Sequence, residues 1–80
     1  MEIKILGSGC SRCRELEKRT REALEKAGFH ASVTKVDQMQ DIARYHVMAT
    51  PALVVDEVVE TKGRIPSVEE VIQILIRHFA

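Results

Sequence analysis

Two cysteines stand three residues apart near the start of the chain, in the segment Cys10-Ser11-Arg12-Cys13. A pair at this spacing serves either dithiol–disulfide exchange or the binding of a soft metal, because residues three apart on a helical turn are neighbours. In exchange, one thiolate attacks a disulfide, and the second sulfur then expels the substrate thiol from the mixed disulfide. In exchange chemistry, Cys10 is the expected attacking sulfur, and the spacing supplies Cys13 as the resolving one.

The surroundings of the pair favour a thiolate. The apolar residues Ile3, Ile5 and Leu6 predict a buried strand over residues 2–6, and a glycine-rich turn follows it. A helix comes next, so Cys10 is expected at its N-terminus, where unpaired backbone N–H groups and the positive end of the dipole gather. Such positions lower the pKa of a cysteine from about 8.5 into the range of about 3.5 to 7.5.

Arg12 and Arg14 occupy the first turn of this helix, although the dipole favours acidic residues there by roughly 0.3 to 1 kcal/mol per charge. One hypothesis is that they stabilise the Cys10 thiolate or steer an acidic partner. The other is that they are two solvated arginines of a charged helix. Residues 1–35 hold eight basic and five acidic side chains, so the half of the chain with the cysteines is the basic half.

Apolar residues at helical or alternating spacing predict six further elements after the first strand. In chain order they are a helix from residue 13 to Gly28, a strand at 31–36, a helix opened by Asp37 and Gln40 as a capping box, strands at 52–55 and 58–61, and a helix capped by Ser67 with Glu70 three residues on. Helical crossovers make parallel strands, and a closing hairpin adds an antiparallel pair. We expect one α/β domain over residues 1–80, of order β-α-β-α-β-β-α, with a four-stranded mixed sheet and helices on both faces.

The same patterns predict which side chains are buried. Met39, Ile42 and Ala43 are expected to face inward from the second helix, and Met48 is expected to fill the core or border a substrate groove. His30 and His78, at the ends of elements, are expected to face solvent. The last helix is expected to bury one stripe that leaves Ile74 outside: Val68, Val71, Ile72, Leu75, Ile76 and Phe79.

Composition and charge exclude several classes of protein. The 80 residues are 45% hydrophobic and 30% charged, which is typical of one small globular domain. Twelve basic side chains balance twelve acidic ones, and Phe29, Tyr45 and Phe79 are the only aromatic residues, so no nucleic-acid partner is expected. The apolar runs, such as residues 52–55 and 74–76, are far shorter than the roughly 20 residues of a membrane span. The N-terminus lacks the pattern of a signal peptide, which predicts a cytoplasmic protein without a membrane partner.

The sequence resembles the thioredoxin-like superfamily, and within it the small, glutaredoxin-sized redox-active disulfide proteins, over nearly its whole length. Three features carry the resemblance: the strand, turn, cysteine pair and helix at the start, the segment Tyr45-His46-Val47-Met48-Ala49-Thr50-Pro51, and the closing hairpin with its capped helix.

The resemblance implies a fold, an activity and a substrate site. The Thr50–Pro51 peptide bond would be cis and face the cysteine pair, and the Thr50 backbone would pair with a bound substrate chain. The implied activity is thiol–disulfide exchange on protein substrates, with a thioredoxin-reductase-like protein restoring the dithiol. No cofactor is predicted.

Several positions depart from the family pattern. An acid usual six residues before the first cysteine is replaced by Lys4, so the family's route for deprotonating Cys13 does not carry over. The glycine usual after the second helix is His46, a residue type that tolerates a left-handed backbone at some strain. Three further departures leave the redox potential open and predict no glutathione dependence: Gly9 before the first cysteine, Ser11-Arg12 between the two, and Lys62-Gly63-Arg64 after the last strand.

Two other hypotheses use the same residues. Cys10 and Cys13 are also suited to a soft-metal carrier for copper or zinc in a βαββαβ ferredoxin-like fold. That fold ends in a strand, whereas residues 67–79 predict a helix, and it has no use for Thr50 and Pro51. The third hypothesis is an inactive thioredoxin-like interaction domain whose cysteines are incidental.

Overall fold

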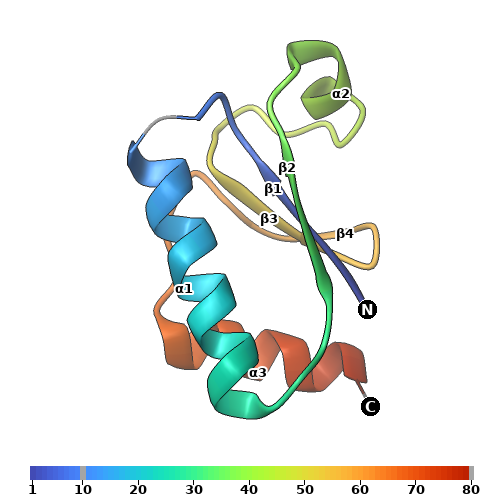
Figure 1. Cartoon of the computed structure of the whole chain (residues 1–80). Helices are drawn as coiled ribbons and strands as arrows, with labels where there is room; N and C mark the ends of the chain where they lie inside the picture. Colours follow the sequence, from blue (N-terminus) through green and yellow to red (C-terminus); the bar gives the residue numbers. More distant parts are fainter. Residues whose placement is uncertain (10, 80) are drawn as a thin grey trace.

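The computed structural model describes residues 1–9 and 11–79, and it confirms the predicted α/β class and order of elements (Figure 1). Among these residues, none of the helices has the length and apolar character needed to cross a membrane. In chain order the elements are β1 (Glu2–Leu6), α1 (Ser11–Ala27), β2 (Ser32–Val36), α2 (Met39–Ala43), β3 (Ala52–Val55), β4 (Val58–Lys62) and α3 (Val68–Phe79).

The four strands form one mixed sheet of order β2-β1-β3-β4. β1 runs parallel to β2 because α1 carries the chain back between them, and it runs antiparallel to β3. Ile5 lies opposite Lys35 on one side and Leu53 on the other. The turn that follows β1 and the segment that leads into β3 lie at the same end of the sheet, the upper end in Figure 1.

Alternation along β1 divides the core between the two faces of the sheet. Ile3 and Ile5 point to the face covered by α1 and α3, whereas Leu6 points to the face covered by α2. Each fully buried aliphatic side chain stabilises the fold by roughly 1.5 to 3 kcal/mol. The larger cluster consists of Ile3, Ile5, Leu16, Ala23, Leu24, Leu53, Val55, Val71, Ile74 and Leu75, and the smaller one of Leu6, Ile42, Ala52 and Val54.

The β3–β4 hairpin turns without glycine. Asp56 and Glu57 both adopt left-handed conformations, with φ of 49° and 68°, as a two-residue turn that follows the twist of the strands requires. Neighbouring groups offset the strain: the Glu2 N–H donates to the Asp56 carboxylate at 2.9 Å, and the Asp56 N–H donates to the Glu2 carbonyl at 2.8 Å. The hairpin that the sequence predicts is therefore present. Hydrogen bonds from β1 stabilise its turn, which lacks the glycine or asparagine that such turns usually contain.

The capping box predicted for α2 is wrong. Gln38 occupies the N-cap position and makes no side-chain cap hydrogen bond, and the helix extends over five residues. So short a helix buries one side chain, Ile42, against the sheet. Met39 and Met48 are 76% and 99% exposed, and Ala43 is also exposed, so none of the three fills the core.

The buried stripe of α3 is rotated from the predicted one. Its N-cap is confirmed, since the Glu70 N–H donates to Ser67 Oγ at 3.1 Å. The buried side chains are Val71, Ile74 and Leu75, whereas Ile76 is 45% exposed. The reason is that α3 packs against α1 as well as against the sheet. The side chains that face both neighbours are therefore the buried ones.

The C-terminal end of α3 differs from the prediction in two side chains. His78 continues the buried stripe one turn beyond Ile74, and its side chain is 14% exposed and bonded to the Glu60 carboxylate, so it does not face solvent freely. Phe79 is 71% exposed and contacts Phe29, with 4.9 Å between the ring centroids. His30 is exposed, as predicted.

Candidate active site around Cys13 and Pro51

Cys10, the predicted attacking sulfur, lies outside the described residues, so the geometry of the site rests on Cys13 and its neighbours. Cys13 stands in the first turn of α1, and it is 3% exposed. This burial suits a sulfur that acts on a partner within the molecule more than one that meets a substrate first.

Gly7 brings Cys13 and Pro51 together. A methyl group in place of a Gly7 hydrogen would stand 2.1 Å from Cys13 Sγ and 3.9 Å from the Cα of Pro51. Gly7 shares the sheet face of Ile5, by alternation along the strand, and this face points toward α1. The sulfur therefore occupies the space that any other side chain at residue 7 would fill, and it lies close to the proline.

The loop before β3 presents Pro51 toward this point. Its peptide bond to Thr50 is cis, and Pro51 is fully buried, whereas Thr50 is exposed. The Gly63 N–H donates to the Pro51 carbonyl at 2.9 Å. Gly63 has φ of 74°, and a methyl group there would stand 2.9 Å from Cβ of Ala49, so a glycine is needed both for the backbone and for the close approach.

His46 lies near the start of the same loop and has a left-handed backbone, with φ of 58°, at the position where the family pattern has glycine. The predicted tolerance for this conformation is confirmed. Its side chain is exposed.

The two arginines of the first helical turn bind backbone carbonyl groups. Arg12 Nη2 donates to the Gly63 carbonyl at 3.0 Å, and Arg14 Nη1 donates to the Gly9 carbonyl at 2.9 Å. Because Gly63 also holds Pro51, the Arg12 guanidinium connects the start of α1 to the proline loop.

A small cleft of about 120 Å³ opens beside Cys13. Two of the side chains that line it, Lys35 at the end of β2 and Asp37 directly after it, were not predicted from the sequence as part of the site. The Gly7 N–H donates to the Val36 carbonyl at 2.9 Å, which continues the parallel pairing past β1 and brings Asp37 beside the turn. The strand topology could have predicted these two residues, because the carboxyl ends of neighbouring parallel strands meet at one edge of a sheet.

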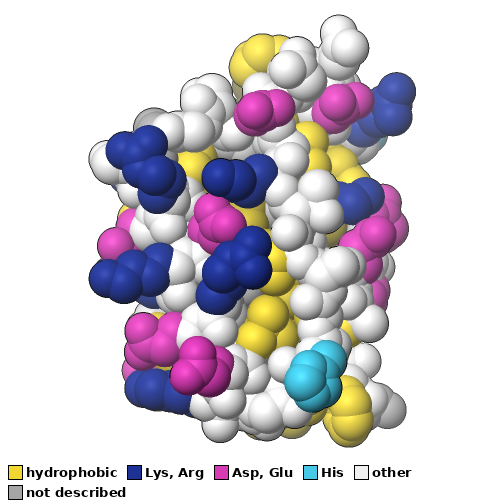
Figure 2. Space-filling view, viewed as in Figure 1, with side chains coloured by type: hydrophobic (Ala, Val, Ile, Leu, Met, Phe, Trp, Pro, Cys, Tyr) yellow, Lys and Arg dark blue, Asp and Glu magenta, His cyan; other side chains and the backbone are white. Residues whose placement is uncertain are grey.

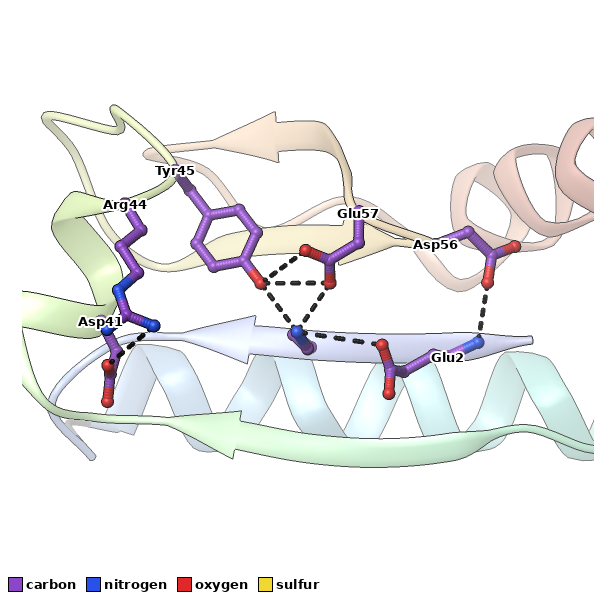
Figure 3. A network of polar contacts seen from close by, with 7 residues as sticks. Glu2, Asp41, Arg44, Tyr45, Asp56 and Glu57 are labelled. Carbon is purple, nitrogen blue, oxygen red and sulfur yellow. Dashed lines mark hydrogen bonds and ion pairs between the residues drawn. The ribbon is translucent and has the colours of Figure 1, made fainter.

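Lys4 does not take the place of the missing acid. It lies on the sheet face opposite Gly7, where Lys4 Nζ donates to the Tyr45 hydroxyl at 2.8 Å and to Glu57 Oε1 at 2.6 Å (Figure 3). The hydrogen bonds to Glu57 and Tyr45 raise the pKa of the Lys4 ammonium above its ordinary value of 10.5. Lys4 therefore stays protonated, and it is no proton acceptor for Cys13.

The fold proposed for a soft-metal carrier is wrong for this chain. A ferredoxin-like domain closes with a strand, whereas this chain closes with α3 after the β3–β4 hairpin. Within residues 1–9 and 11–79, no group of three or more His, Cys, Asp or Glu side chains is arranged to hold a metal ion.

Comparisons with known proteins agree with this fold. A family model described as a thioredoxin domain matches residues 1–76. A protein named thioredoxin from Methanothermobacter thermautotrophicus is 40% identical over 75 residues, which cover 94% of this chain and 97% of that protein. Another named thioredoxin, from Methanocaldococcus jannaschii, is 38% identical over 69 residues, covering 86% and 79%. The solved structure of thioredoxin 1 from Thermosipho africanus shares the fold, with a TM-score of 0.65 and 20% identity over 99% of this chain and 94% of that one.

Proposed function

The chain belongs to the thioredoxin family, whose members are thiol–disulfide oxidoreductases, and on that premise we propose that Cys10 and Cys13 reduce or exchange disulfides of protein substrates. The observation that carries the proposal is the convergence of Gly7, Cys13 and Pro51 at one end of the sheet. A buried second sulfur beside a proline loop suits a resolving thiol next to a bound substrate chain.

The reaction proceeds in two exchange steps. The Cys10 thiolate attacks one sulfur of the substrate disulfide, a new S–S bond forms, and the other substrate sulfur leaves as a thiolate that takes a proton from solvent. Deprotonated Cys13 then attacks Cys10 Sγ, which forms the Cys10–Cys13 disulfide and releases the second substrate sulfur. The substrate has gained two electrons and two protons. An electron donor of the thioredoxin-reductase class returns two electrons and two protons to the protein.

Thr50 and Pro51 position the substrate, and the arginines support the attacking thiolate. Support for the first assignment is the exposed Thr50 beside a fully buried Pro51. The Thr50 backbone pairs with an extended substrate segment as a short antiparallel strand. Arg12 and Arg14 place two guanidinium groups in the first turn of α1, where positive charge favours the thiolate form of a cysteine.

The thiol proton of Cys13 needs an acceptor, and we assign this role to Asp37. Both residues line the same cleft of about 120 Å³, which is large enough for solvent to relay the proton. Lys4, at the family's usual position for an acid, is held on the other face of the sheet.

A cytoplasmic setting suits this chemistry, because the cytosol keeps thiols reduced and a dithiol in it is ready to attack. The test is a redox titration of the purified protein in buffers of graded thiol-to-disulfide ratio, followed by alkylation of thiols and mass spectrometry. We expect a reversible two-electron transition in which Cys10 and Cys13 are oxidised together, with a slope of about 30 mV per tenfold change in the ratio. Oxidation of either cysteine independently of the other would refute the proposal.

A further inference from the structure

Cations without carboxylate partners gather at the end of α1 that carries Cys13. Further along the helix, each cation is paired with a glutamate one turn earlier: Arg19 with Glu15 at 2.9 Å, Arg21 with Glu17 at 3.0 Å, and Lys26 with Glu22 at 3.4 Å. In the part of the chain that the structure describes, Arg12, Arg14 and Lys18 form no ion pair. Figure 2 shows dark blue side chains over the start of α1, and mixed dark blue and magenta ones further along it.

Lys62 adds a cation next to the proline loop. It is the last residue of β4, it lies opposite Ala52 in the register, and it is exposed. It precedes Gly63, whose N–H donates to the Pro51 carbonyl. No carboxylate of residues 1–9 and 11–79 lies within ion-pair distance of Lys62. We call Arg12, Arg14, Lys18 and Lys62 the basic rim.

The basic rim borders an open path for a polypeptide. A cleft of about 350 Å³ lies between the segment Tyr45–Val47 and β4, and Lys62 lines it. Arg64 and Glu60 also line this cleft, but both are paired, Arg64 with Glu70 and Glu60 with Arg77 at 2.9 Å. A chain that passes from the start of α1 over the Pro51 loop toward this cleft therefore meets first Arg12 and then the Lys62 ammonium.

Asp37 does not cancel the rim. It lines the cleft beside Cys13 together with two cations, Arg14 and Lys35, and Lys35 also pairs with Glu17 at 3.5 Å. The cations around the candidate site therefore outnumber the carboxylates, and the local field is positive. Fields of this kind raise the association rate of oppositely charged partners by about 10- to 1,000-fold at low ionic strength.

We infer that the basic rim selects protein disulfides flanked by acidic residues. This inference rests on the proposed function and names its substrate class. A substrate segment with Asp or Glu on either side of its disulfide would place carboxylates near Lys18 and Lys62 while its sulfur approaches Cys10. A basic segment would be repelled from the same positions.

The test compares two peptides of one sequence, each with an internal disulfide, flanked in one by glutamates and in the other by lysines. Reduction is followed as kcat/KM in about 20 mM and about 500 mM salt, where the screening length differs several-fold. We expect about a tenfold preference for the acidic peptide at low salt, and nearly equal values at high salt.

Two double variants with the same change in charge separate the rim from the charge of the molecule as a whole. K18Q/K62Q removes two rim cations that have no part in the exchange steps, and we expect the preference to fall to about threefold or less. R21Q/K26Q removes two paired cations from the far part of α1, and we expect the preference to remain. The alkylation rate of Cys10 by neutral iodoacetamide should be the same in both variants and in the wild type.

Equal kcat/KM values for the two peptides at low salt, with both reduced, would overturn the inference and leave the oxidoreductase in place. An equal loss of preference in both double variants would also overturn it, because the effect would then belong to net charge. Failure of the wild-type protein to reduce either peptide would refute the proposed function itself.

Discussion

Gly7 is the residue on which the geometry of the site depends most directly. The space that its missing side chain leaves is occupied by Cys13 Sγ, at 2.1 Å from where a methyl carbon would stand. The sequence predicts a turn at Gly7, because glycine commonly ends strands. The contact with a sulfur six residues later depends on how α1 packs on β1, which no local pattern reveals.

Asp37→Asn tests the proton acceptor. We expect single-turnover disulfide reduction to slow by about tenfold or more near neutral pH, because Cys13 would lack the carboxylate that takes its proton before it attacks Cys10. The rate should approach that of the wild type as the pH rises, because hydroxide can then take the thiol proton in place of the carboxylate. Rapid-mixing kinetics from pH 6 to pH 10 measure this profile.

The matched control is Asp41→Asn, which removes one carboxylate from the neighbouring helix, where it pairs with Arg44 at 3.9 Å. The nucleophilic reactivity of Cys10, measured as its rate of alkylation by iodoacetamide, should be unchanged in both variants. Identical pH profiles for the two variants would show that Asp37 takes no proton from Cys13.

For the helices and strands, the sequence predicts which elements exist and in what order more accurately than it predicts which face of each helix is buried. β1, α1, β3 and α3 have strong periodicity, and their bounds agree with the prediction to within about two residues, as is usual for such signals. α2 is different, since a five-residue helix has too few positions for a period to define its buried side. The inward prediction for Met39 fails for this reason.

Ile74 and Ile76 form a pair that tests the orientation of α3. Ile74 is 3% exposed in the main core, whereas Ile76 is 45% exposed. Replacing Ile74 by Ala should lower the free energy of unfolding by about 2 to 5 kcal/mol, and the same change at Ile76 by about 1 kcal/mol or less. Urea denaturation measures both values. An equal cost at the two positions would contradict the packing of α3 described above.

At the scale of the whole molecule, the candidate site joins segments that are distant in the chain. Gly7, Cys13, Asp37, Pro51 and Gly63 meet at one end of the sheet. The cysteine pair and the proline are identifiable from residue types and spacing. The neighbours that complete the site follow from strand register, which also turns Lys4 to the other face.

In the proposed reaction Cys10 attacks the substrate and Cys13 resolves the mixed disulfide, and trapping that mixed disulfide distinguishes the two roles. Purified Cys13→Ser protein is mixed with a disulfide-containing protein and examined by intact mass and peptide mapping without reductant. We predict a stable mixed disulfide at Cys10 in this variant and none in Cys10→Ser protein, whose disulfide reduction should be abolished. Continued turnover by Cys10→Ser, or no adduct on Cys10 in Cys13→Ser protein, would show that Cys10 is not the attacking sulfur.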